Sequence, residues 1–279
     1  MICEHEIPTN SRLYFSANAK LKRDIEYKAS QFLNNNGFDE IVTPNFSYSQ
    51  HQSIDDDTKL IKLQDENNNT LALRADSTLD AVRIITKRLG RTTSHKKWFY
   101  IQPVFSYPSS ETYQIGVEWI GYNNISDIIN LNCNLLSHLN TSALLQIANI
   151  NIPLRISKEF DIDIELFKDG NIGALYDLNL KWLSKLIEVK SVNDLESIAT
   201  LLPECIKNEI ENLIKIANNI KYDNLTLSPL YYSAMKYYDN IYYRLIHNNL
   251  TISKGGGYKS EGLNSQGFAI YTDNLLKIV

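Results

Sequence analysis

The sequence predicts an α+β fold in which a mixed, mainly antiparallel sheet is flanked by helices. Strand-like segments rich in aromatic and β-branched residues come in pairs, as in residues 97–107 and 112–122, which are separated by the turn-rich "PSSE". Elsewhere in the chain, apolar residues recur every three to four positions, which is the period of an amphipathic helix. The paired strands and the separate helical stretches together predict this fold class.

The first ninety residues contain two predicted helices with strands between them. The first helix spans 17–36 and stops at "NNNG"; the second begins near residue 79 and is closed by Gly90. Between them, "DEIVTPNFSY" predicts a short strand. Because Pro44 cannot donate a backbone hydrogen bond, we expect this strand near a sheet edge or ending at the proline. Residues 59–74 then predict a hairpin of two strands joined by a polar turn.

The middle of the chain turns helical again from Ile125, and "IPLRISKE" (152–159) predicts a strand. Residues 160–222 then repeat leucine and isoleucine at helical spacing. We expect one core domain over 1–279, with 160–222 as a small helical subdomain inserted in it.

The C-terminal part returns to strand and turn character. A run of tyrosines over 231–243 is typical of a sheet core, although the same residues are able to line a cleft. Three consecutive glycines, 255–257, allow a ligand or a neighbouring strand to approach closely. They lack the strand-GxGxxG-helix context of a dinucleotide site and the ending of a phosphate-binding P-loop.

Composition excludes several function classes. Twenty-eight Lys and Arg oppose 32 Asp and Glu, a net charge of −4, so we expect no nucleic-acid partner, which would need a basic face. No apolar run is long enough to span a membrane and no signal peptide is evident, which predicts a cytoplasmic protein. The three cysteines and five histidines lack metal-ligand spacing, so we expect incidental reduced thiols and no metal site.

The segment "RADSTLDAVR" (74–83) has two interpretations. Asp76 and Thr78 stand where a helix begins, and side chains of this kind cap free backbone N–H groups. The same residues are able to form the mouth of a ligand site, and the arginines Arg74 and Arg83 to contact phosphate or to make ordinary surface ion pairs. Composition and spacing favour the helix cap without excluding the site.

Glu118 lies in the otherwise apolar segment "GVEWI". A buried carboxylate there would be costly unless it met a ligand or a partner. Gln114 alternates in phase with Glu118, so both are predicted to face the same side of one strand.

Taken in order, these segments resemble the catalytic core of class II aminoacyl-tRNA synthetases, in particular the histidyl branch. "NNNGFDEIVTPNFSY" resembles motif 1, "FYIQPVFSYPSSETYQIGVEWIG" motif 2 with its following strand, and "GGGY" with "GFAIYTDNLL" the glycine-rich strand and motif 3. The resemblance runs from about Pro8 to Leu276. It implies a class II synthetase-like fold and dimerisation through the motif 1 region.

The departures from that family concern its ATP-binding arginines. The motif 2 position is occupied by Ser106, the motif 3 position by Asn274, and a third arginine position aligns with Leu227. Arginine holds phosphate through planar, bidentate contacts that these side chains cannot make. The chain also ends just after motif 3, so we expect no anticodon-binding domain and no tRNA charging.

The amino-acid end of the synthetase site is better retained. Asp76 and Thr78 match the residues that hold the ammonium of histidine, and Gln114 and Glu118 match those that read its imidazole. The family's tyrosine pair is matched to Tyr231 and Tyr232. Its Thr-Gly is replaced by Ser233 and Ala234, and the alanine adds bulk to the pocket.

A synthetase-like core with these departures resembles the regulatory subunits of short-form ATP phosphoribosyltransferase. The resemblance implies a non-catalytic chain without cofactor, which activates a separate catalytic subunit in histidine biosynthesis and transmits feedback inhibition by L-histidine. It also implies a homodimer, within a hetero-octamer with the catalytic subunit. Two alternatives stay open: a catalytically dead paralogue acting as an interaction module, and a residual amino-acid-activating enzyme.

Overall fold

The main sheet of the molecule has eight strands. The structure is a computed structural model, and it describes residues 6–51, 56–232, 238–260 and 262–279. The strand order is β1-β5-β6-β11-β10-β9-β7-β8, and all neighbours are antiparallel except β1 with β5 and β7 with β8. The predicted mixed, mainly antiparallel sheet is confirmed. Its strands are β1 (Asp39–Glu40), β5 (Lys97–Ser106), β6 (Ser110–Ile120), β7 (Leu144–Asn149), β8 (Leu225–Leu227), β9 (Tyr238–His247), β10 (Leu250–Ser260) and β11 (Leu263–Tyr271).

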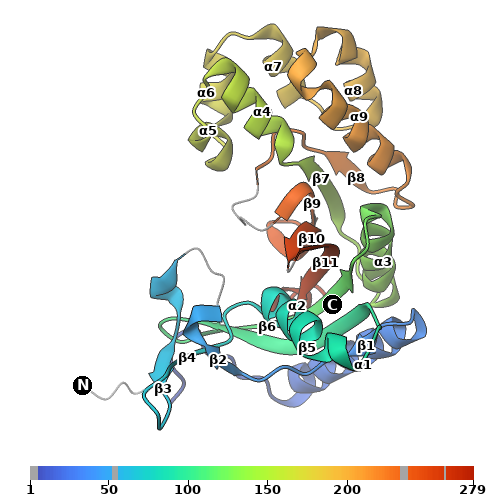
Figure 1. The fold of residues 1–279 in the computed structure, drawn as a ribbon. Coiled ribbons are helices and arrows are strands. Elements are labelled where there is room, and N and C mark those ends of the chain that lie inside the picture. The colour runs from blue at the N-terminus through green and yellow to red at the C-terminus, as the bar shows by residue number, and fades with distance from the viewer. Residues whose placement is uncertain (1–5, 52–55, 233–237, 261) are drawn as a thin grey trace.

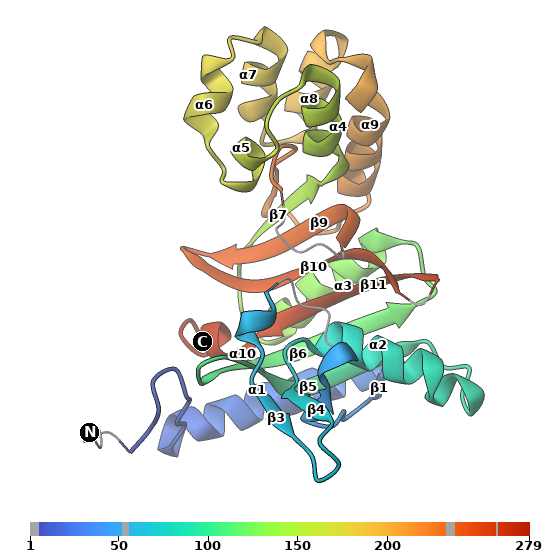
Figure 2. The ribbon, with the colours of Figure 1, turned by 60° about the vertical axis from the view of Figure 1, so that its left-hand side comes forward.

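Helices cover both faces of this sheet (Figures 1 and 2). The predicted first helix is α1 (Ser16–Asn35), and it packs with α3 (Ile125–His138) over one face, which holds the main hydrophobic core. The opposite face carries α2 (Ser77–Lys87), which contacts β6 and β10. The short α10 (Thr272–Leu275) follows β11. Within the described ranges, every helix is too short or too polar to cross a lipid bilayer.

The two faces of the sheet differ because side chains alternate along each strand. On β6, Ile115 and Val117 are fully buried in the core beneath α1 and α3. Gln114 and Glu118 point to the other side, as their phase predicts. The strand register shows which residues of the neighbouring strands point to this second side. We call this side the polar face, and it includes Tyr100, Gln114, Glu118, Arg244, Lys254 and Tyr258.

A second, small sheet of three strands lies beside α2 (Figure 2). It consists of β2 (Phe46–Tyr48), β4 (Thr70–Leu73) and β3 (Lys62–Gln64), with both pairings antiparallel. The predicted hairpin at 59–74 is confirmed as β3 and β4. The predicted strand around Pro44 is divided, because Pro44 separates β1 in the large sheet from β2 in the small one.

Six helices lie together at the other end of the molecule, beyond β7 (Figure 1). They are α4 (Asn151–Phe160), α5 (Glu165–Lys168), α6 (Ile172–Asp177), α7 (Lys181–Ile187), α8 (Val192–Ile198) and α9 (Glu204–Asn218). The strand predicted at 152–159 is wrong, because this segment is α4. Pro153 falls in its first turn, where no backbone donor is needed, and the buried Ile152 and Ile156 are one helical turn apart.

Candidate ligand site on the polar face

The helix start at Asp76 is a cap in the structure. Asp76 precedes α2 in an extended conformation, and its Oδ1 accepts a hydrogen bond from the backbone N–H of Leu79 at 3.0 Å. Burial raises the pKa of Asp76, whereas this hydrogen bond and the positive charge of Lys254 lower it. The backbone N–H of Thr78 also bonds this carboxylate and lowers its pKa. Because a carboxylate has about four lone-pair sites, the cap and a ligand contact are compatible.

Thr78 connects the start of α2 to the sheet. Its Oγ1 lies 3.1 Å from the hydroxyl of Tyr100, which projects from β5 and has no exposed surface. The Tyr100 hydroxyl also donates to Glu118 Oε1 at 3.4 Å. The start of α2, with Asp76 and Thr78, and the β6 residue Glu118 therefore share one neighbourhood.

Glu118 is fully buried, and both of its carboxylate oxygens have tyrosine partners. Oε1 accepts from Tyr100, and Oε2 accepts from the hydroxyl of Tyr258 on β10. Burial raises the pKa of Glu118 to about 8, against the smaller opposing effect of these hydrogen bonds. At pH 7 the group is therefore mainly protonated. The expectation that a carboxylate here would need a partner is correct, and the protein itself supplies two tyrosines.

Two glycines make room for this cluster. A Cβ on Gly116 would lie 2.0 Å from Cζ of Tyr100, and one on Gly267 would lie 2.1 Å from Oε2 of Glu118. Both distances are far below van der Waals contact, so only glycine at these positions leaves space for the Tyr100 ring and the Glu118 carboxyl group.

Gln114 lies on the same face, between Gln102 on β5 and Tyr271 on β11 in the strand register. It is half-buried. Four residues along a strand span roughly 13 Å, so a ligand that touches both Gln114 and Glu118 must lie along β6.

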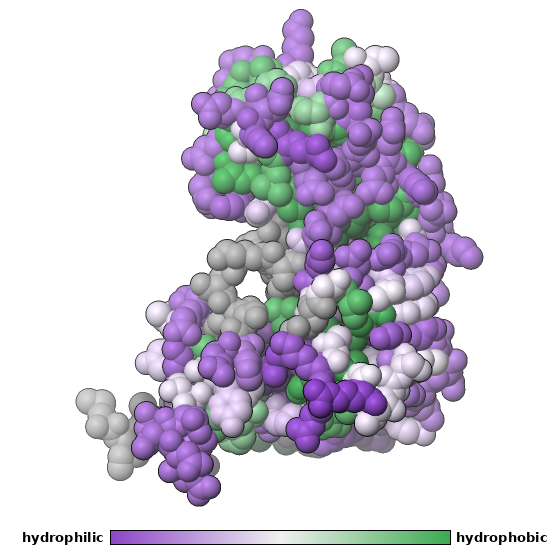
Figure 3. Space-filling model, viewed as in Figure 1, coloured by the Kyte–Doolittle hydropathy of each residue, from purple (hydrophilic) through white to green (hydrophobic). Residues whose placement is uncertain are grey.

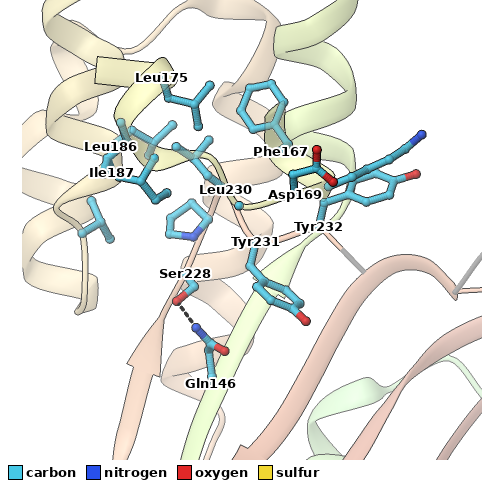
Figure 4. A pocket seen from close by; sticks show the side chains of 15 residues that line it. Gln146, Phe167, Asp169, Leu175, Leu186, Ile187, Ser228, Leu230, Tyr231 and Tyr232 are labelled. Atoms are coloured by element: carbon cyan, nitrogen blue, oxygen red, sulfur yellow. Dashed lines mark hydrogen bonds between the residues drawn. The ribbon is translucent and has the colours of Figure 1, made fainter. Parts of the chain in front are cut away.

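Tyr231 and Tyr232 point away from each other (Figure 4). Tyr231 is directed toward the sheet, where its ring stacks on Tyr242 at 5.6 Å between centroids and its hydroxyl accepts from Arg244 at 3.3 Å. Tyr232 lies beside Asp169 at the helical end of the molecule. Only Tyr231 of the predicted pair thus reaches the polar face, and Ser233 and Ala234 lie outside the described residues.

Both tyrosines line a pocket of about 400 Å³ between the helices and the segment after β8 (Figure 4). Its walls are mainly apolar, and Gln146 at its edge donates to Ser228. The surface around this end of the sheet is hollowed between the helical end and the side of α2 (Figure 3).

Four residues of the polar face were not predicted from the sequence. Tyr100 and Tyr258 bond Glu118. Burial raises the pKa of both tyrosines most, and the nearby Tyr238 raises it further. The available signal was a second tyrosine pair in the sequence at 237–238, of which Tyr238 is the first residue of β9. The fourth residue is Lys254.

Two cations project from the polar face at its centre. Arg244 already has partners within the protein. Its Nε donates to Gln146, and its guanidinium lies 4.3 Å from the ring centroid of Tyr231. Lys254 is half-buried, with its ammonium 5.5 Å from the ring centroid of Tyr271. Burial lowers the pKa of Lys254, and the charge of Asp76 opposes this.

Arg74 fits neither interpretation that the sequence offered. It is 1% exposed, and its guanidinium donates to the backbone carbonyls of Thr43, Pro44 and Pro103 at 2.7–3.0 Å, so it holds the chain between β1 and β2 against β5. Arg83 makes the expected ion pair, with Asp80 at 2.9 Å.

The three residues that the sequence comparison matches to synthetase arginines lie on β5, on α10 and on β8. Ser106 ends β5 with its hydroxyl near the carbonyl of Tyr107. Asn274 in α10 donates to the carbonyl of Thr251 at 2.9 Å, and Leu227 is fully buried in β8. None of these side chains carries a charge with which to hold phosphate.

Comparison with known sequences shows what this chain is similar to. The model of the histidyl-tRNA synthetase family matches residues 14–275. A protein of Helicobacter hepaticus named ATP phosphoribosyltransferase regulatory subunit is 42% identical over 277 residues, covering 99% of both chains. A protein of Wolinella succinogenes with the same name is 41% identical and covers 99% of this chain and 96% of the relative.

Solved structures share the fold at much lower identity. A Bacillus halodurans protein described as an ATP phosphoribosyltransferase regulatory subunit/histidyl-tRNA synthetase superposes with a TM-score of 0.86 at 20% identity, over 99% of this chain and 84% of its own. Histidyl-tRNA synthetase of S. aureus superposes with a TM-score of 0.69 at 19% identity, over 98% of this chain and 73% of its own. The class II synthetase-like fold is confirmed.

Proposed function

The chain belongs to the ATP phosphoribosyltransferase regulatory subunits, within the histidyl-tRNA synthetase family, and from this premise we propose that it activates a separate catalytic subunit and senses L-histidine on the polar face. In this proposal Asp76 and Thr78 bind the ammonium, and Gln114 and Glu118 bind the imidazole. Tyr231 closes the site from the side of the helices, with Tyr232 behind it.

The observation that carries the proposal is the meeting of Asp76, Thr78 and Glu118 around Tyr100. An anion and a hydroxyl from the start of α2 and a carboxyl group from β6 offer the partners that an ammonium and an imidazole require. Histidine inhibits through such a site only if it binds the inactive arrangement of the complex more tightly than the active one.

Calorimetry with L-histidine tests this proposal, with the chain alone and with its catalytic subunit. We expect saturable binding that is at least tenfold weaker in Glu118→Ala, and unchanged in Leu201→Ala, an exposed position far along the chain in the 3₁₀ turn Ala199–Leu201. Absence of heat from histidine in both preparations would refute the sensing role.

We also propose a homodimer through residues 34–48, with the catalytic subunit completing a hetero-octamer. Three large apolar side chains in this segment are exposed to solvent: Val42 at 78%, Phe46 at 53% and Tyr48 at 47%. Exposed apolar side chains gathered in one segment are typical of an interaction surface, which supports the proposal.

The interaction module with a decayed pocket is the second candidate. It is favoured by Glu118, whose two oxygens are already satisfied by Tyr100 and Tyr258 and do not require a ligand. In that case the catalytic subunit is activated equally with and without histidine.

The non-catalytic role is supported by the uncharged Ser106, Asn274 and Leu227. A residual amino-acid-activating enzyme would show amino-acid-dependent exchange of pyrophosphate into ATP, and we expect none.

A further inference from the structure

Lys254 stands at the centre of the polar face. In the strand register it lies between Arg244 on β9 and Ala269 on β11, so its side chain projects to the side that carries Glu118. Burial disfavours the ammonium form of a half-buried lysine among tyrosines, so its charge is costly unless an opposite charge compensates it.

Asp76 caps α2, and α2 contacts β10, the strand that carries Lys254. Each charge stabilises the charged form of the other group. Yet within the described parts of the chain, Lys254 makes no ion pair at 4.0 Å or less and no hydrogen bond. The anion and the cation therefore lie more than 4.0 Å apart, with the anion bonded to the backbone of the first turn of α2.

The other charged groups of this face are already engaged. Arg244 is held by Gln146 and by the ring of Tyr231. Glu118 is held by two tyrosines and is mainly protonated at neutral pH. Asp76 and Lys254 thus remain as the opposite charges without a direct partner ion, among the residues described.

We propose that Lys254 is a binding residue for the α-carboxylate of a free amino acid whose α-ammonium is held by Asp76. The proposal rests on the amino-acid-binding function above and names the group that selects a zwitterion. The ammonium and carboxylate of an amino acid are carried by adjacent carbon atoms, so the ligand fills the gap with charges opposite to those of its two walls. Charge-assisted hydrogen bonds from Lys254 give selectivity for ligands with a free carboxylate.

Calorimetry in the presence of the catalytic subunit tests this proposal. One comparison removes the carboxylate of the ligand, and the other removes the ammonium of Lys254. L-histidine is compared with L-histidinol and histamine, which keep the imidazole and the amine. We expect the unmodified protein to bind histidine at least tenfold more tightly than either analogue. Lys254→Met loses that preference, and Lys254→Arg keeps most of it, which also shows that the site is still folded. Lys259→Met, five residues along β10 and exposed, is the matched control and leaves affinities unchanged.

Three other results are informative. Histidine binding that is equal or tighter in Lys254→Met would overturn the proposal, since Lys254 would then keep ligands out. Lys254-dependent binding of another amino acid, and not of histidine, would support this inference and refute the histidine-sensing role. Failure of the unmodified complex to bind any of the twenty amino acids would overturn both.

Discussion

A carboxyl group without exposed surface, such as that of Glu118, is normally a liability. It is tolerated here because Tyr100 and Tyr258 donate to it and because it is mainly protonated at neutral pH. Gly116 and Gly267 provide the space, and neither glycine is explained by a turn or by a positive φ. These residues depend on one another. A substitution at any of them would leave a buried polar group without its hydrogen-bond partner, which is costly.

The raised pKa of Glu118 predicts the direction in which pH affects stability. The folded protein holds this proton up to about pH 8, whereas an unfolded chain releases it near pH 4.5. The stabilisation is therefore complete below about pH 4.5 and is lost as the pH rises through about 8. With about 1.4 kcal/mol for each pKa unit, the effect is on the order of a few kcal/mol.

Glu118→Gln removes the titrating group and keeps its shape. We measure urea unfolding at several values between pH 5 and pH 9. As the pH rises, we expect the free energy of unfolding of the unmodified protein to fall more than that of Glu118→Gln. Asp76 also has a raised pKa and is present in both proteins, so the comparison isolates the titration of Glu118 together with its coulombic coupling to Asp76. Parallel curves for the two proteins would contradict the assignment.

At the scale of elements, the N-terminus of α2 has two roles that substitution is able to separate. Asparagine caps a helix as well as aspartate does, but has no charge. We expect Asp76→Asn to keep the stability within about 0.5 kcal/mol, because the cap to Leu79 stays and the desolvation of a charge is relieved. Asp76→Ala should cost about 1 kcal/mol.

The measurement pairs chemical unfolding with amino-acid binding. If Asp76 binds the ammonium, both variants bind histidine at least tenfold more weakly, although only the alanine variant is less stable. Unchanged binding by Asp76→Asn would leave the helix cap as the only role of this residue.

For one element, the spacing of apolar residues was insufficient to distinguish a helix from a strand. The segment 152–159 contains alternating and helical spacing at once, and its length does not decide between them. Packing decides: Ile152 and Ile156 are both fully buried when the segment is helical, beside α9. The hairpins, in contrast, were predictable because their turns and their alternation agree.

At the scale of the whole molecule, the proposed homodimer predicts a defined oligomeric state. Val42→Glu places a charge at the most exposed large apolar side chain of segment 34–48. We expect the unmodified chain to sediment with twice the mass of one chain and the variant to sediment as a monomer at micromolar concentration.

Leu201→Glu is the control for this experiment, because Leu201 is 57% exposed at the opposite, helical end. Analytical ultracentrifugation of all three proteins checks the outcome. A dimer that persists in Val42→Glu would place the interface elsewhere.

The sequence by itself determined the fold class, the order of the strands along the chain and the phase of Gln114 and Glu118, because these depend on local periodicity and turns. It also pointed to Asp76 and Thr78 at a helix start. Only the tertiary structure decided which residues meet around Glu118, and that Arg74 supports the backbone. It also brought Lys254 opposite Asp76, 178 positions earlier in the chain. Strand register and helix packing bring such residues together across long sequence separations, and no local pattern records them.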